Sequence, residues 1–318
     1  MKDLAKDYGN GIVRINTDFE RAHLAASHLI MSGDHAAFVD VGTNFSAPNL
    51  LKVLDHYQIS KENVDYIIVT HVHLDHAGGA GNLLQLLPNA KLIVHPRGAR
   101  HMIDPTKLVA GATAVYGEEA MQANYGTLQP APVERVIEGT DGLSIDLNGR
   151  ELRFLDTPGH AKHHFCVLDV ETNSFFTGDT FGISYREFDT EKGAYALAST
   201  TPVQFDPDAA HNSINRLMSY SPAHMYLTHY GQVGDVARLA DDLHRSLDAQ
   251  VAIAQKYSDK GDERIALMKE DIMQVCLADI RAHGCTLSEA DCRELLDLDV
   301  GVNAQGLDVW LNQQVVAG

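Results

Sequence analysis

The sequence is poor in cysteine and has only one tryptophan in 318 residues. Its four cysteines are Cys166, Cys276, Cys285 and Cys292, and none of them forms a Cys-x-x-Cys pair. Thiolate zinc cages and disulfide frameworks both need cysteines in closely spaced or evenly paired sets. The sequence therefore predicts free thiols and excludes a cysteine-based metal site as the source of function.

Long apolar runs are also missing. No stretch approaches the roughly 20 apolar residues that a membrane-spanning helix needs. The first residues, Met1 to Asp7, are followed by no apolar run long enough for a signal peptide. From these two absences we expect a soluble protein with no membrane partner and a cytoplasmic location.

Basic residues are scarce relative to acidic ones. The chain has 25 Lys and Arg against 43 Asp and Glu, which gives a formal net charge of -18. Binding to nucleic acid depends on Lys and Arg gathered on one face, and no basic cluster interrupts the acidic balance here. We therefore expect a small-molecule substrate and no nucleic-acid partner.

Apolar segments alternate with amphipathic ones over the first 95 residues, which predicts an α/β layered domain. A second block, from Glu134 to Thr177, contains further short apolar runs separated by turn residues such as Asn148-Gly149. Two such halves predict one sheet packed on another, with helices outside. The expected strands in order are residues 11–15, 27–31, 36–41, 65–70, 91–95, 134–137, 143–146, 151–156, 164–170, 174–177 and 224–228, and the expected helices of the first block are 48–56 and 82–87.

Two further regions read as helical. Residues 96–132 are rich in Ala, Gly, Met and Tyr and predict a helical insertion. Asp206-Pro207 supplies an N-cap and a first-turn proline for a helix, and Thr286 and Glu289 have capping-box spacing. From Gly231 onward apolar residues recur at helical spacing. We expect a catalytic domain over residues 1–230 and a helical extension over 231–318 packed on it, whose apolar faces would also suit a homodimer.

The strongest motif for chemistry is the run Thr70-His71-Val72-His73-Leu74-Asp75-His76, which follows the apolar segment Tyr66 to Val69. Residues two apart in an extended segment point the same way, so His71 and His73 can converge on one metal ion. Asp75 and His76 lie at the turn into a helix and can face a second ion. Three histidines and one aspartate at these offsets rarely arise by chance.

Four groups do not complete two metal sites, and the missing imidazole and carboxylate groups occur further along the chain. His160, Asp179 and His229 each follow an expected strand, in the segments Thr157 to His160, Thr177 to Thr180 and Leu227 to Gly231. Strand ends gather at one edge of a sheet, where loops leave an open cleft. A single strand-end histidine is usually structural, but separate segments that repeat this placement favour a metal site.

These motifs resemble those of the metallo-β-lactamase superfamily over about residues 11–231, nearer to its glyoxalase II, lactonase and thioesterase-like members than to the secreted β-lactamases. The resemblance implies an αββα sandwich. It also implies ligand roles: His71, His73 and His160 for the first metal, Asp75, His76 and His229 for the second, and Asp179 bridging both. The tail after Gly231 is similar only in layout to the C-terminal helices of a quinolone-signalling thioesterase-like relative.

Two adjacent cations can share a hydroxide and aim it at a carbonyl, which predicts a dinuclear hydrolase acting on an ester, thioester or lactone. Asp75 could hand a proton to the leaving group. Imidazole and carboxylate ligands suit two divalent ions, with zinc expected first and iron or manganese as the alternatives. Asp40 is a candidate partner that orients a ligand histidine, and a plain turn carboxylate is the alternative reading.

Other residues near the motifs have weaker cases. His164 matches the second histidine of the family's Gly-His-x-x-x-His pattern and could orient substrate or a ligand, although a structural role fits equally. Tyr185 could donate a hydrogen bond to a substrate oxygen, although its segment also reads as an ordinary loop. His163 is expected to be exposed.

Three other functions stay open at this stage. Flavodiiron-type relatives use the same scaffold and a di-iron centre to reduce oxygen or nitric oxide. A nuclease of the same superfamily is disfavoured by the acidity of the chain. A non-catalytic protein that keeps the metal ligands is the third reading. A serine hydrolase has no support, because the sequence contains no Gly-x-Ser-x-Gly segment.

Overall fold

The computed structural model describes residues 1–201 and 203–317, which form two compact units. The first unit contains Met1–Asp156, His163–Gly178 and Met225–Gln232. The second contains Thr157–Lys162, Asp179–His224 and the chain from Val233 onward. The expected boundary between residues 230 and 231 is not tested by this division and stays a prediction.

The first unit contains a sheet with seven strands in the described residues, arranged in sequence order. Strands β1 to β4 pair antiparallel and β4 to β7 pair parallel. Parallel neighbours need crossover segments, and here helices supply them. The bounds are β1 (Ala5–Asp7), β2 (Ile12–Asn16), β3 (Ala26–Ser32), β4 (His35–Val39), β5 (Val64–Val69), β6 (Lys91–Val94) and β7 (Val136–Glu138).

Both faces of this sheet are buried, which explains why its central strands are continuously apolar in sequence. In β5, Ile67 and Val69 join a core cluster with the helices, while Ile68 joins a second cluster with the other sheet. Phe38 in β4 belongs to the first cluster and Val39 to the second. Side chains that alternate between two cores fix the register of these strands.

The second sheet follows the order β13-β12-β11-β10-β9-β8. Strands β8 to β11 pair antiparallel, and β11 pairs parallel with β12. Strands β9, β11 and β12 therefore run in the same direction, so their carboxyl ends lie at one edge of the sheet. The bounds are β8 (Ser144–Leu147), β9 (Arg150–Asp156), β10 (Phe165–Asp169), β11 (Ser174–Gly178), β12 (Met225–Leu227) and β13 (Gly231–Val233).

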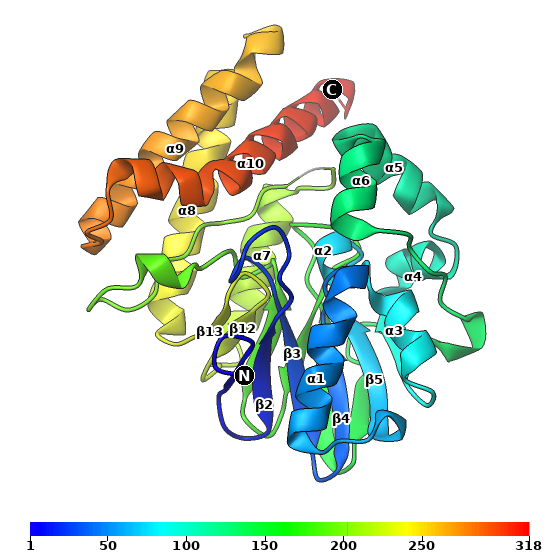
Figure 1. Ribbon diagram of the computed structural model, residues 1–318. Helices are drawn as coiled ribbons and strands as arrows, with labels where there is room; N and C mark the ends of the chain where they lie inside the picture. The colour runs from blue at the N-terminus through cyan, green and yellow to red at the C-terminus, as the bar shows by residue number, and fades with distance from the viewer. Residues whose placement is uncertain (202, 318) are drawn as a thin grey trace. The chain divides into compact units, whose positions relative to one another are not determined.

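Helices of the first unit cover the outer face of its first sheet, and α1 crosses in front of β4 in Figure 1. Pro48 stands in the first turn of α1, where its missing N–H costs no hydrogen bond. Residues 96–132, where the sequence predicts a helical insertion, contain α4, α5 and α6. The bounds are α1 (Ala47–Tyr57), α2 (Leu74–Ala77), α3 (Ala80–Leu86), α4 (Pro96–Ile103), α5 (Thr106–Tyr116) and α6 (Glu118–Tyr125).

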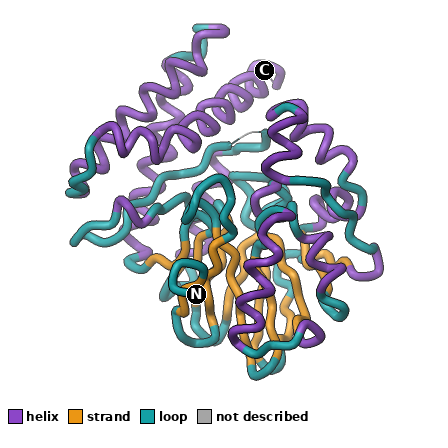
Figure 2. Tube along the Cα trace, viewed as in Figure 1, coloured by secondary structure: helices purple, strands orange, loops and turns teal. Residues whose placement is uncertain are grey.

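The second unit is mostly helical, as the purple tube in Figure 2 shows for the C-terminal part of the chain. Asp206 caps α7 as predicted, because its side chain accepts a hydrogen bond from the backbone N–H of Ala209. The predicted capping box is wrong, since Ser288 rather than Thr286 accepts from the N–H of Asp291. The bounds are α7 (Pro207–Met218), α8 (Val236–Lys256), α9 (Arg264–His283) and α10 (Glu289–Ala317), and short 3-10 turns η1 to η5 lie at Asn44–Ser46, Lys61–Asn63, Val133–Arg135, Arg186–Phe188 and Gly261–Glu263.

Two mixed sheets plus helices are the predicted α/β sandwich with a C-terminal helical region. The sequence missed the short strands β1 and β13, and it placed residues 134–137 with the second sheet although β7 pairs with β6 of the first. Within residues 1–201 and 203–317, no helix combines the length and apolar character needed to cross a membrane.

Candidate metal centre

The His71 to His76 motif begins two residues beyond Val69, the carboxyl end of β5. The chain leaves the sheet in a short loop and enters α2 at Leu74, as the sequence predicts. His71 and His76 are buried, while His73 and Asp75 are half-buried. A buried strand thus holds the first histidine in place, and the segment that follows leaves His73 and Asp75 partly accessible.

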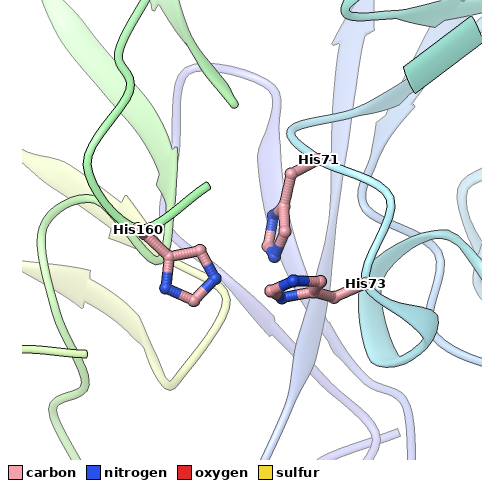
Figure 3. A group of neighbouring side chains, drawn as sticks. All are labelled: His71, His73 and His160. Carbon is pink, nitrogen blue, oxygen red and sulfur yellow. The ribbon is translucent and has the colours of Figure 1, made fainter. Parts of the chain in front are cut away.

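The ligand candidates of the first unit lie close together. The rings of His71 and His73 are 4.4 Å apart at their centroids, and those of His71 and His76 are 4.1 Å apart. Figure 3 shows His71 and His73 side by side on the loop that follows β5. Asp75 Oδ2 lies 3.5 Å from Nε2 of His76 and 3.3 Å from Nε2 of His229.

These spacings fit a shared metal ion. Atoms bound tetrahedrally to one zinc at about 2.0–2.2 Å lie roughly 3.3–3.6 Å from one another. Asp75, His76 and His229 each offer one ligand atom within 4.8 Å of the other two, and this whole set belongs to the first unit. Two imidazoles and one carboxylate are also a donor set typical of zinc, iron and manganese sites. The residues therefore fit the metal that the motif predicts.

Asp40 orients His76 from behind, which confirms its predicted role. Its carboxylate is fully buried and accepts a hydrogen bond of 2.7 Å from Nδ1 of His76. It also accepts from the backbone N–H of Thr70 at 2.8 Å and from the hydroxyl of Thr228 at 2.6 Å. A carboxylate on Nδ1 fixes the tautomer in which Nε2 carries the lone pair for a metal. The same contacts tie the end of β5 to the end of β12.

His229 is fixed by a different acceptor. Its Nδ1 donates to the backbone carbonyl of Leu24 at 2.7 Å, and the side chain is buried. This bond also directs Nε2 toward Asp75. Carbonyl and carboxylate acceptors behind two histidines therefore prepare both Nε2 atoms as ligands.

The second unit holds the two remaining predicted ligands, and it brings them together. Nε2 of His160, which is also labelled in Figure 3, lies 3.5 Å from Oδ2 of Asp179, and both residues are buried. The hydroxyls of Ser199 and Thr201 lie 3.1 and 3.2 Å from Nδ1 of His160. The pair thus has the same spacing as the Asp75 and His76 pair. That all seven side chains form one dinuclear centre stays a prediction.

His164 and Tyr185, two of the weaker candidates, are both buried but lie in different surroundings. His164 is buried with its ring 5.0 Å from that of His71, and a Cβ on Gly178 would come within 2.7 Å of its Nε2. Tyr185 is buried, and its hydroxyl donates to Asp299 at 3.0 Å, which favours a structural role. Catalytic roles for these two residues stay predictions.

The expectation that His163 is exposed is wrong. The residue is half-buried, its ring stacks at 6.2 Å on that of His71, and its Nδ1 faces the backbone N–H of Val72 at 3.5 Å. Burial, helped by the nearby imidazole of His73, lowers the pKa of His163 to about 3. This histidine is therefore neutral near pH 7.

Sequence reasoning missed the hydroxyl groups that support the ligands. Thr70 and Thr228 both donate to Asp40, and each directly precedes a histidine that the sequence predicts as a ligand. The repeated dipeptide Thr-His at two strand ends is the signal that could have identified them. Ser199 carries no comparable signal, because it lies 39 positions from His160 in an irregular segment.

Comparison with protein families finds a match to the metallo-beta-lactamase superfamily over residues 22–229. The metallo-beta-lactamase fold-containing protein ST1585 of Sulfurisphaera tokodaii is 31% identical over 176 residues, 54% of this chain and 62% of that protein. An atrochrysone carboxyl ACP thioesterase of Aspergillus fumigatus is 29% identical over 120 residues, 38% of this chain and 28% of the fungal protein. In both cases the aligned part spans less than two thirds of the relative.

Solved structures give the same fold. The structure of ST1585 superposes with a TM-score of 0.66 at 22% identity, covering 94% of this chain and 99% of the archaeal one. A metallo-beta-lactamase family protein from Thermus thermophilus gives a TM-score of 0.68 at 18% identity, covering 97% and 95%. These likenesses confirm the predicted fold.

Proposed function

Since the chain belongs to the metallo-β-lactamase superfamily, we propose that it is a hydrolase that cleaves a thioester, or a related ester or lactone, with the help of two divalent metal ions. The Asp75, His76 and His229 set carries this proposal, because its spacing matches one metal coordination sphere. Thioesters come first because two of the similar proteins, from Aspergillus fumigatus and Emericella nidulans, are named as thioesterases.

The proposal assigns His71, His73 and His160 to one ion, Asp75, His76 and His229 to the other, and Asp179 to a bridging position. Chain direction in the second sheet supports it. His160 lies four positions beyond the end of β9, Asp179 directly follows β11, and His229 follows β12. Because these strands run the same way, their carboxyl ends share one edge. Zinc is the first expectation for both ions, with iron or manganese as alternatives.

Bound at these residues, the ions would polarise a substrate carbonyl and make water a stronger acid. The protein itself holds the proposed ligand side chains in the orientation and tautomer that a metal ion needs. Asp40 and the carbonyl of Leu24 keep His76 and His229 in the tautomer that binds metal. Asp75 is half-buried rather than enclosed, so its carboxylate can take a proton from the attacking water and pass it to the leaving group.

The test combines metal analysis of the purified protein with hydrolysis of thioesters, lactones and phosphodiesters. We expect about two metal equivalents per chain and turnover of thioesters. The variant His73→Ala should lower kcat/KM by on the order of 10³-fold, whereas His56→Ala, at an exposed helical histidine, should leave it unchanged. Iron with oxygen or nitric oxide reduction and no hydrolysis would replace the proposal with the redox reading.

A further inference from the structure

Two histidines outside the proposed metal centre meet between α7 and α8. Nδ1 of His211 in α7 lies 2.6 Å from Nδ1 of His244 in α8, and both side chains are half-buried. The two helices belong to the second unit and pack against each other (Figure 1). The rings are inclined by only 13°, with centroids 4.9 Å apart. Nitrogen atoms 2.6 Å apart are closer than two stacked faces can approach, so the rings meet edge to edge through their Nδ1 atoms.

Two facing nitrogens at this distance need one proton between them, so one ring donates and the other accepts. The outer nitrogens show how many protons the pair can hold. Nε2 of His211 lies 3.2 Å from Oδ1 of Asp248, and a carboxylate can only accept. Nε2 of His244 lies 3.2 Å from Oδ1 of Asn215, whose amide accepts or, when turned over, donates. The pair can therefore be neutral or carry one positive charge, but a second charge places an N–H group on both facing nitrogens.

The surroundings of the pair oppose that second charge. Burial, and after it the imidazole of His211, lower the pKa of His244. Asp241 and Asp248 of α8 act on it in the opposite direction with smaller effects, and among the described residues no group of α9 or α10 does so. Where α8 meets α9, its charged groups act on Asp279. The charged or titratable residues within four positions of either histidine, or in the segment that contacts α7 before residue 163, are Asp208, Asp241, Asp242, Arg245, Asp248, His160 and Lys162.

Helix α7 also holds the turn that carries His160, through residues on either side of His211. The hydroxyl of Ser213 donates to the backbone carbonyl of Pro158 at 2.5 Å. The backbone of Ala210 lies so near the turn that a Cβ on the preceding glycine would come within 2.4 Å of its Cα. A movement of α7 away from α8 would therefore disturb the turn and with it His160, a proposed metal ligand.

We infer that His211 and His244 form a pH-sensitive clamp, which holds α7 on α8 while one proton lies between their Nδ1 atoms and opens when the pair gains a second positive charge. The clamp positions the turn of His160, so acid should loosen the proposed first metal site. The effect on activity rests on the proposed function, whereas the clamp itself does not. Since the closed clamp binds one proton fewer than the unfolded chain does in acid, the folding equilibrium constant should fall by up to about tenfold per pH unit as the pH drops below the ordinary histidine range.

The variant His244→Asn tests the clamp, because its amide can donate to His211 from near the place of Nδ1 but cannot gain a charge. Urea unfolding of the zinc-loaded protein is measured from pH 7.5 to pH 4.5. The unfolding equilibrium constant of His244→Asn should depend less on pH than that of the wild type, by up to about tenfold per pH unit. His211→Asn should give the same change, and His56→Asn, at an exposed histidine of α1, should behave as the wild type. Nitrogen NMR of the imidazole rings should show one shared proton at pH 7.5 and a proton on each facing Nδ1 at pH 4.5.

Hydrolysis of thioesters supplies the second readout. Between pH 7 and pH 5, kcat/KM of His244→Asn should fall less than that of the wild type, by up to about tenfold. Stability that depends on pH equally in His244→Asn and the wild type would overturn the clamp, even if both proteins hydrolyse thioesters. An equal fall of kcat/KM in the two proteins would overturn the link to the turn of His160. If the stability difference appears but no thioester is cleaved at any pH, the clamp stands and the proposed function fails.

Discussion

The buried carboxylate of Asp40 supports several parts of the proposed metal centre at once. It contacts His76, a proposed metal ligand, and the two threonines that precede His71 and His229, so it links the ends of β4, β5 and β12. Asp40 also has a positive φ of 50°, a conformation that aspartate tolerates better than most residues. The sharp turn after β4 therefore positions the carboxylate of Asp40 against His76, so the conformation of this turn matters to the site.

Replacing Asp40 with Asn should weaken metal binding about 10–100-fold, because the amide cannot accept all of these hydrogen bonds and hold the imidazole tautomer. Chelator competition on the purified protein measures the change. Asp65→Asn is the matched control, since Asp65 accepts a 2.7 Å bond from His35 on a neighbouring strand. Equal metal affinity in Asp40→Asn and the wild type would contradict the assigned role.

His28 provides a second prediction at this scale, because it is buried between the sheets against Phe176 and Tyr226. Burial lowers its pKa to about 3, well below the ordinary histidine value of 6.5. Between these two values only the unfolded chain binds the proton, so stability is lost as the pH falls, by up to about 1.4 kcal/mol per pH unit. His28→Leu should reduce the slope of the unfolding free energy against pH by the contribution of one proton, up to about 1.4 kcal/mol per pH unit.

Denaturant unfolding measured from pH 7 down to pH 4 tests this expectation. His56→Leu, at an exposed histidine of α1, is the control and should keep the wild-type slope. A His28→Leu protein that loses stability toward acid as steeply as the control would show that the imidazole of His28 is protonated in the folded state.

The sequence was sufficient to predict side chains that the structure brings close together within each unit, but not all of the groups that contact them. His71, His73, Asp75 and His76 stand at fixed offsets, so the motif itself contains the geometry. The carbonyl of Leu24 contacts His229 across 205 positions, and any residue type has a carbonyl. The composition of the sequence and the spacing of its residues therefore cannot identify a backbone acceptor of this kind.

At the scale of single elements, two helical glycines should respond to alanine in opposite ways. A Cβ on Gly81 in α3 would lie 1.8 Å from the carbonyl oxygen of Gln129, far inside contact distance. A Cβ on Gly111 in α5 would meet nothing within 4 Å. Gly111→Ala should stabilise the protein by about 0.5–1 kcal/mol through helix propensity, whereas Gly81→Ala should destabilise it by about 1–3 kcal/mol through overpacking.

Urea unfolding of the two variants measures both free energies against the wild type. The sign is the informative quantity, because the two substitutions are chemically identical and both lie inside helices. Stabilisation by Gly81→Ala would mean that α3 does not approach the segment around Gln129 as closely as described.

Prediction of helices and strands succeeded where apolar residues recur over several turns. It failed where only a few residues determine whether an element forms or where it begins. The apolar spacing of Leu239, Leu243 and Leu247 predicts α8, because several turns repeat the signal. Strand β1 is three residues long and is half-buried or exposed, so alternation cannot reveal it. The capping-box spacing of Thr286 and Glu289 predicts Thr286 as the cap of α10, although Ser288 stands directly before the helix and accepts from the N–H of Asp291.

At the scale of the whole molecule, the excess of acidic residues bears on stability as well as on partners. Asp75 and Asp179 belong to the proposed metal centre, where bound cations would offset their charge. The remaining carboxylates are spread along a chain with a formal net charge of -18. Their mutual repulsion acts over the Debye length, which is about 30 Å at 0.01 M salt and about 8 Å at 0.15 M.

Raising the salt concentration from 0.01 to 0.15 M should therefore raise the melting temperature of the metal-loaded protein. Self-repulsion destabilises a compact state that carries a large net charge, and screening reduces it. A gain of about 1 kcal/mol corresponds to roughly 1.5 °C for 318 residues, because unfolding has an entropy of about 2.1 cal/mol/K per residue. Calorimetric scans in sodium chloride and in choline chloride should give the same shift, because screening depends on ionic strength and not on the cation. A shift in only one salt would indicate specific ion binding, and a fall in both would show that attractive ion pairs outweigh the repulsion among the carboxylates.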